Sequence, residues 1–225
     1  MNLDIIESLE DNIKVIENLK KKIKNIFIYA CKYNNIDLLK IAIRFYKNSI
    51  NKSAIYWACY NGNLKIVKEL INTFRDKLPI DKWAIYWACY NGNLKIVKEL
   101  VNAYGDKLPI DKTAISGACE NNNLEIVKEL VNAYGDKLPI DKTAIRNACY
   151  HNNTEIVEIL IETFKDKLPI DSDAISNACY HDNKEIVEVL VNAYGDKLDI
   201  DKEIIYELLN KKGYYDILQN FIKIE

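Results

Sequence analysis

The chain repeats itself every 30 residues, and this repetition constrains its fold more than any other feature of the sequence. Residues 54–70 read AIYWACYNGNLKIVKEL, and residues 84–100 read the same letters. Residues 101–115 (VNAYGDKLPIDKTAI) recur unchanged at residues 131–145. A unit of this length cannot bury its own apolar face, so it has to stack on its neighbours. The sequence therefore predicts a solenoid.

The pattern predicts an array of about seven units that spans residues 22–225. The first unit is diverged, with Ala30 and Cys31 in the places of Ala58 and Cys59, and the last unit is short and polar. Residues 1–21 have the apolar spacing of an amphipathic helix, and we expect this segment to cap the stack. The predicted units lie near residues 22–50, 51–80, 81–110, 111–140, 141–170, 171–200 and 201–225.

Each unit reads as two helices joined by a turn. Asp111 precedes a stripe of small and apolar residues that includes Ala118 and Cys119, and Asp is a favoured helix N-cap. An Asn/Gly cluster then breaks the helix, because these residues tolerate a left-handed turn. A second helix follows, with Val127 and Leu130 on one face, and a Pro-containing connector leads to the next unit. No segment shows a convincing strand pattern.

The motif residues of the unit resemble the ankyrin repeat. Residues 113–119 (TAISGAC) resemble the family's Thr-Pro-Leu-His-x-Ala-Ala, and residues 123–128 (NLEIVK) resemble its Gly-His-Leu-Glu-Ile-Val-Lys. The units are 30 residues long, whereas those of the family have about 33, and the shortfall lies where the family builds its β-turn finger. The resemblance implies an all-α solenoid of stacked helix-turn-helix ankyrin-like repeats, with reduced or absent β-turn fingers.

The resemblance also implies a function. Ankyrin repeats usually bind protein partners through their first helices and the adjoining loops, so we expect a non-catalytic protein–protein interaction scaffold. The richness in Asn, Ile, Lys and Tyr is similar to that of ankyrin-like proteins of large amoeba-infecting viruses.

Composition and motifs argue against several other classes of protein. There are 33 acidic and 31 basic residues, with a net charge of −2, which does not suit a protein that holds nucleic acid on a strongly basic face. No apolar run approaches the roughly 20 residues that span a bilayer. The acidic residues near the start do not fit a secretory signal, so we expect a cytoplasmic protein. Without a nucleotide-binding or hydrolase motif, we expect no enzyme, cofactor, metal site or small-molecule substrate.

The six cysteines follow the repeat and indicate core packing rather than disulfides or zinc. Cys59, Cys89, Cys119, Cys149 and Cys179 are 30 residues apart, and each takes the small-residue position of a first helix. Packed helices lie about 8–10 Å apart, whereas a disulfide needs Cα atoms within about 7 Å. We therefore expect buried thiols.

The repeats differ mainly on one face of the first helix, and this variation predicts where a partner binds. A constant frame that carries one varied face is typical of a modular binding surface. Aromatic residues gather there in two successive units, and Trp and Tyr supply large contact areas at low entropic cost. The predicted partner-binding residues are Tyr56, Trp57, Tyr60, Trp83, Tyr86, Trp87, Tyr90 and Arg146.

Three alternatives remain open at this point. The aromatic rings could instead pack between neighbouring repeats, most readily Tyr56 and Tyr86, which replace the histidine of the ankyrin motif. The aromatic face could bind single-stranded nucleic acid, although few cations lie near it and Lys52 and Lys82 are the closest in sequence. An enzyme without a recognisable motif is the third alternative.

Overall fold

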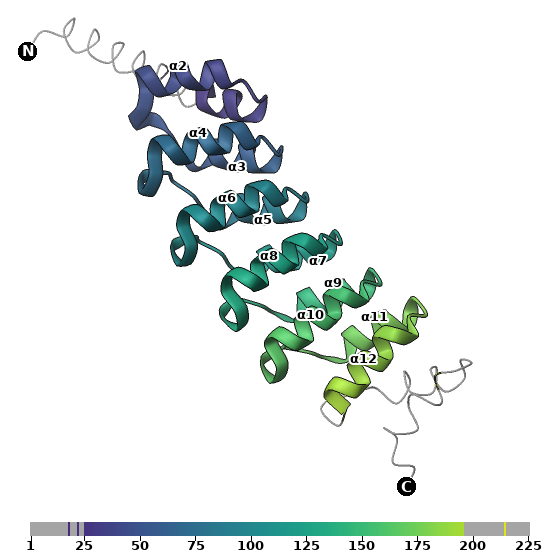
Figure 1. Ribbon diagram of the computed structural model, residues 1–225. Coiled ribbons are helices and arrows are strands. Elements are labelled where there is room, and N and C mark those ends of the chain that lie inside the picture. The colour runs from purple at the N-terminus through teal and green to yellow at the C-terminus, as the bar shows by residue number, and fades with distance from the viewer. Residues whose placement is uncertain (1–17, 19–21, 23–24, 196–213, 215–225) are drawn as a thin grey trace, which may run out of the picture.

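The computed structural model describes residues 18, 22, 25–195 and 214, and within them it is a single stack of helix pairs (Figure 1). Helices and 3₁₀ turns alternate along this part of the chain, and it contains no strand. The predicted cap at residues 1–21 lies outside the described residues except at Asn18. The predicted last unit, residues 201–225, lies outside them except at Tyr214.

The first helix of each pair and the second form two parallel rows along the stack (Figure 1). Residues 25–32 are helical and precede α2. The later first helices are α3 (Lys52–Tyr60), α5 (Lys82–Tyr90), α7 (Lys112–Glu120), α9 (Lys142–Tyr150) and α11 (Ser172–Tyr180). The second helices are α2 (Ile36–Tyr46), α4 (Leu64–Phe74), α6 (Leu94–Tyr104), α8 (Leu124–Tyr134), α10 (Thr154–Phe164) and α12 (Lys184–Tyr194).

The core lies between the two rows, where the sequence pattern predicts it. In α7 Ala114, Ile115, Ala118 and Cys119 are fully enclosed, and α8 contributes Ile126, Val127 and Leu130. The same positions are buried in every pair from α3 to α12. Small residues on the first helices let adjacent repeats approach closely, while the longer side chains of the second helices fill the remaining space. The prediction of an all-α solenoid is confirmed.

A residue in the left-handed backbone conformation closes the turn between the two helices of each pair. Gly62 and Gly92 have φ angles of +70° and +72°, and Asn122, Asn152 and Asp182 take the same place at φ between +56° and +58°. The following asparagine joins neighbouring repeats in the first part of the stack. The side-chain amides of Asn93 and Asn123 donate to the carbonyls of Cys59 and Cys89 at 2.9 and 2.8 Å.

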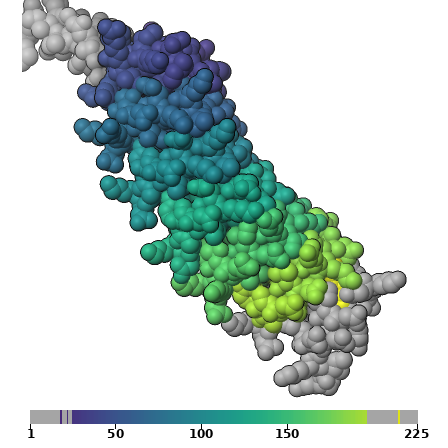
Figure 2. Space-filling view, viewed as in Figure 1, coloured from purple at the N-terminus to yellow at the C-terminus, as the bar shows by residue number. Residues whose placement is uncertain are grey.

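Short connectors replace the fingers. Each begins with one 3₁₀ turn: η1 (Lys47–Ser49), η2 (Arg75–Lys77), η3 (Gly105–Lys107), η4 (Gly135–Lys137) or η5 (Lys165–Lys167). After η2 to η5 come a buried leucine, a proline and an isoleucine, and the next first helix then starts. The connectors protrude along one edge of the molecule (Figure 2).

Candidate functional site

The predicted aromatic residues of α3 and α5 form one continuous cluster of rings. We call it the aromatic surface, and it consists of Tyr56, Trp57, Tyr60, Trp83, Tyr86, Trp87 and Tyr90. They come together because the first helices of adjacent repeats are stacked in register, so equivalent positions 30 residues apart become neighbours. Each of these rings lies on a first helix, as the sequence pattern predicts.

Trp87 joins the two repeats at the centre of the aromatic surface. Its ring centroid lies 4.8 Å from that of Tyr60 and 6.5 Å from that of Tyr56, both on α3. On its own helix it lies 4.9 Å from Tyr86 and 5.3 Å from Tyr90. The interplanar angles of these four contacts range from 64° to 85°, which is the edge-to-face arrangement that aromatic quadrupoles favour.

Exposure divides the tryptophans into two kinds. Trp83 is 43% exposed, while Trp57 and Trp87 are half-buried. Trp57 and Trp87 share a position whose side chain reaches back to the preceding first helix. In later repeats Asn147 occupies this position and donates to the carbonyl of Ser116 at 3.3 Å. The rings thus pack between repeats and also border solvent.

Gly117 ends the aromatic surface. It occupies the position of Trp57 and Trp87 in the next repeat, and it is buried against the preceding helix. A Cβ atom added there would lie 2.8 Å from Cε2 of Tyr86 and 3.5 Å from Cβ of Tyr90. The ring of Tyr86 therefore rests directly on the backbone of α7.

Tyr29, Lys32 and Tyr33, which the sequence pattern does not single out, lie next to the aromatic surface on the side of the first unit. Tyr29 and Tyr33 are 55% and 59% exposed, with ring centroids 4.5 Å apart. The ammonium group of Lys32 lies 4.6 Å from the ring centroid of Trp57 and 5.5 Å from that of Tyr33, within cation–π range. The match of Cys31 to Cys59 already placed Tyr29 at the position of Trp57, but the shortened unit obscured it.

The polar atoms of the aromatic surface have no partner within the described part of the chain. Its tyrosine hydroxyls and indole N–H groups make no hydrogen bond there. Desolvation by neighbouring groups raises the pKa of Tyr56 and Tyr86, with smaller contributions from Asp81 and Glu120 respectively. Both phenols therefore stay neutral at physiological pH and can donate hydrogen bonds to a bound molecule.

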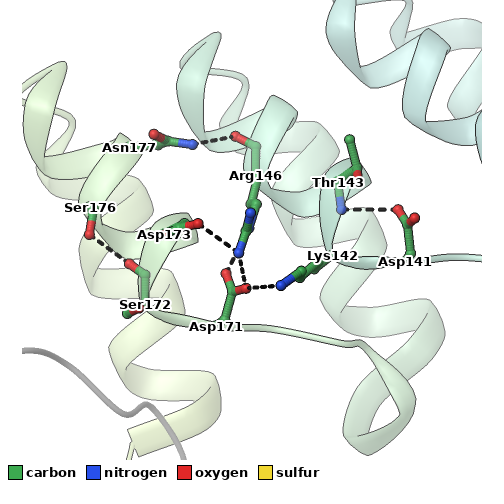
Figure 3. A network of polar contacts seen from close by, with 9 residues as sticks. All are labelled: Asp141, Lys142, Thr143, Arg146, Asp171, Ser172, Asp173, Ser176 and Asn177. Atoms are coloured by element: carbon green, nitrogen blue, oxygen red, sulfur yellow. Dashed lines mark hydrogen bonds and ion pairs between the residues drawn. The ribbon is translucent and has the colours of Figure 1, made fainter.

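Arg146, the eighth predicted residue, lies away from the aromatic surface and joins two repeats. Its guanidinium binds Asp171 through Nε at 2.9 Å and through Nη2, and Nη2 also lies 2.6 Å from Asp173 (Figure 3). Lys142 approaches the same Asp171 carboxylate at 3.3 Å. This ion pairing is the largest cause of the lowered pKa of Asp171 and of the raised pKa of Arg146.

One predicted helix cap is absent for the same reason. Asp81, Asp111 and Asp141 each accept a hydrogen bond from the backbone N–H two residues later, as predicted. Asp171 makes no such bond, because Arg146 holds its carboxylate instead; the lysine contact alone does not prevent capping, since Asp111 and Asp141 have equivalent lysine partners. The cap expected from the pattern at Asp111 is therefore absent at the equivalent residue of α11.

Burial makes the cysteines unreactive core residues. All six are buried, and desolvation raises the pKa of Cys31 and Cys149 to about 12. A thiol with such a pKa stays protonated, which disfavours both nucleophilic attack and metal binding. Among the described residues there is no group of three or more His, Cys, Asp or Glu side chains placed to hold a metal ion. This part of the chain also has no helix long and apolar enough to cross a membrane.

The comparisons with known proteins agree with the architecture. The family model for ankyrin repeats, described as three copies of the repeat, matches residues 2–81, 27–114, 76–141 and 115–204. Among curated proteins, none matches the chain. Ankyrin repeats are generally modules of protein interaction without catalytic activity of their own. The overlapping matches cover most of the sequence, and the chain belongs to the ankyrin repeat family.

Proposed function

We propose that this protein is a non-catalytic scaffold that binds a protein partner through the aromatic surface. The observation that carries the proposal is the continuous ring cluster across α3 and α5, with Trp83 exposed and the polar atoms of the rings without partners. Tyr29, Lys32 and Tyr33 extend the same binding region.

Rigidity supports this function. Each half-buried ring is held by edge-to-face neighbours, so little side-chain entropy is lost when a partner covers it. Trp and Tyr side chains in such settings often supply most of the binding energy of an interface. Toward the C-terminus the same face carries Ser116, Asn147 and Asn177, which use their polar groups within the stack. The aromatic region is thus the part best suited to a partner.

Affinity capture from the native cell, followed by mass spectrometry, identifies the partner, and two variants then test the surface. Trp83→Ala removes the most exposed ring of the seven on α3 and α5, which contacts Tyr86 at 5.7 Å, so affinity should fall by about 2 kcal/mol with little change in melting temperature. Tyr180→Ala is the matched control, because Tyr180 is 79% exposed at the position equivalent to Tyr60 and Tyr90 but lies on α11. Unchanged affinity in a folded Trp83→Ala variant would refute the proposal.

Salt dependence distinguishes a protein partner from single-stranded nucleic acid. Lys32 and Lys82 approach the aromatic rings, and Lys82 is already paired with Asp111 at 3.1 Å. So few available cations predict a weak dependence of affinity on salt. A steep loss of affinity between low and moderate salt would instead favour nucleic acid. A cytoplasmic location stays a prediction.

A further inference from the structure

The first connector is two residues shorter than the others, and a cleft lies where it meets the second. A single residue, Ile50, separates η1 from the cap of α3, whereas three residues separate η2 from the cap of α5. The missing part includes the counterpart of Leu78, which is buried in its own connector. A cleft of about 600 Å³ lies between η1 and η2, with Phe74 and Ile50 among its apolar residues.

Three cations line this cleft, and the described part of the chain provides no ion pair for any of them. They are Lys47 from η1 and Arg75 and Lys77 from η2. The one carboxylate in the lining, Asp76, lies 4.0 Å from the ammonium group of Lys107 in the next connector. The cleft therefore has a net charge of +2 from its own side chains, next to apolar surface.

Arg75 is present despite a backbone conformation that favours glycine. Its φ and ψ angles are 47° and −129°, and the equivalent positions of three other repeats are glycines, Gly105, Gly135 and Gly195, with similar angles. A side chain is strained in this region of φ/ψ space, and such strain is often found at functional sites. Tyr104 fixes the turn, because its hydroxyl donates to the Arg75 carbonyl at 3.0 Å.

A second cleft in the same molecule provides an internal comparison. It lies between η4 and η5, has a volume of about 530 Å³ and includes Lys165, which shares the strained conformation at φ 48°. Acidic side chains outnumber basic ones in its lining, and Lys167 is already paired with Asp136 at 2.5 Å. Both clefts thus lie between two connectors of the described part of the stack, but only the first of the two has an excess of cations.

We propose that the cleft between η1 and η2 binds a phosphate monoester carried on an apolar or aromatic body. The dianion balances the net charge of the lining, and its three acceptor oxygens match the donors of Arg75, Lys47 and Lys77. The apolar body lies against Ile50 and Pro79, which are only half-buried. The monoester belongs either to a phosphorylated side chain of a protein or to a free nucleotide. This site is separate from the aromatic surface.

Titration of the ¹⁵N-labelled full chain with phenyl phosphate tests the site. Saturable amide shifts should be confined to residues 47–51 and 73–79. Arg75→Gly should weaken binding about tenfold or more, because it removes a charged hydrogen-bonding group. It should also leave the melting temperature unchanged or raise it, because glycine is the native residue at the equivalent positions. Lys165→Gly, the matched control, should keep the affinity of the parent.

Further probes test whether the site prefers a dianion and which kind of molecule carries the phosphate. Benzoate, a monoanion on the same ring, should bind several-fold more weakly than phenyl phosphate. A phosphotyrosine peptide that binds more tightly than adenosine monophosphate assigns the site to proteins, and the reverse order assigns it to nucleotides. Absence of saturable shifts at residues 47–51 and 73–79, equal binding of benzoate, or full affinity in a folded Arg75→Gly variant would each overturn the proposal. None of these results bears on the aromatic surface.

Discussion

At position 146 the chain has arginine where the two neighbouring repeats have Ser116 and Ser176, and this one difference changes how two repeats are joined. The serine hydroxyls donate mainly to their own helices: the Ser116 hydroxyl lies 2.9 Å from the carbonyl of Lys112 and only 3.5 Å or so short of contact is left to the next repeat, where Asp141 lies 3.5 Å away. Arg146 reaches the next repeat and takes Asp171 away from its capping role. From the sequence, Arg146 could be placed on the varied face but not paired, because a carboxylate 25 residues away becomes its neighbour only when the repeats stack.

The ion pair at Arg146 predicts a stability difference that depends on pH. Arg146→Ser should lower the free energy of unfolding by about 1 kcal/mol near pH 7, because the partly screened ion pair is lost while Asp171 regains a capping bond. Asp171 has a lowered pKa in the folded state, so its contribution is present above the unfolded value near 3.8 and is lost as the pH falls below it. The difference between parent and variant should therefore shrink in acid.

Urea unfolding of both proteins at pH 7 and at pH 3 measures this difference. Arg44→Ser is the control, because Arg44 is exposed and has no ion pair within the described part of the chain. It should change stability little at either pH. A variant with the same deficit at pH 3 as at pH 7 would show that Asp171 is not responsible.

At the scale of the element, a tyrosine at the end of three second helices, α6, α8 and α12, joins the helix to the preceding connector. The hydroxyls of Tyr104, Tyr134 and Tyr194 donate to the carbonyls of Arg75, Gly105 and Lys165, each at 3.0 Å. In α4 and α10 the equivalent residues are Phe74 and Phe164, which cannot donate. The helices could be predicted from periodicity, but this cross-link could not, because it depends on a backbone carbonyl whose direction is set by the left-handed cap.

Adding the hydroxyl that α10 lacks should stabilise the protein, and removing the hydroxyl that α8 has should destabilise it. Phe164→Tyr should raise the free energy of unfolding by about 1 kcal/mol, because the new hydroxyl can reach the Gly135 carbonyl across the cleft that both residues line. Tyr134→Phe should lower it by a similar amount, since it removes the existing bond to Gly105. Thermal melts of the two variants measure both effects. A destabilised Phe164→Tyr variant would mean that the cleft has no room for the hydroxyl.

At the scale of the whole molecule, the fold could be predicted because near-identical units of 30 residues bury their apolar faces only by stacking on one another. Cys119 could be assigned to the core from its period alone, and it is fully buried. The exposure of the tryptophans was harder to predict. A position on the outer side of an isolated helix, such as that of Trp87, becomes half-buried only when the preceding repeat is placed beside it. Properties of one unit were therefore predictable, and properties of the joints between units were not.

The same stacking predicts that one substitution has different consequences at the centre and at the end of the array. Each repeat contacts only its neighbours, so disruption of a central repeat uncouples the two sides, whereas disruption of an end repeat removes one interface. Cys119→Asp places a carboxylate without a partner in a fully buried position of α7 and should cost several kcal/mol. Cys31→Asp makes the same change in the first unit, where the loss should stay local.

Two optical probes distinguish these outcomes, because all three tryptophans lie at residues 57–87, on the N-terminal side of Cys119. Tryptophan fluorescence follows only that side of the stack, whereas far-ultraviolet circular dichroism follows every helix. In urea the two transitions should coincide for the parent and for Cys31→Asp, apart from a smaller initial helical signal in the variant. For Cys119→Asp they should separate, since the repeats on either side of α7 then unfold independently. If the transitions of Cys119→Asp coincide at the midpoint of the parent, α7 does not couple the two halves, and the nearest-neighbour account of the stack is wrong.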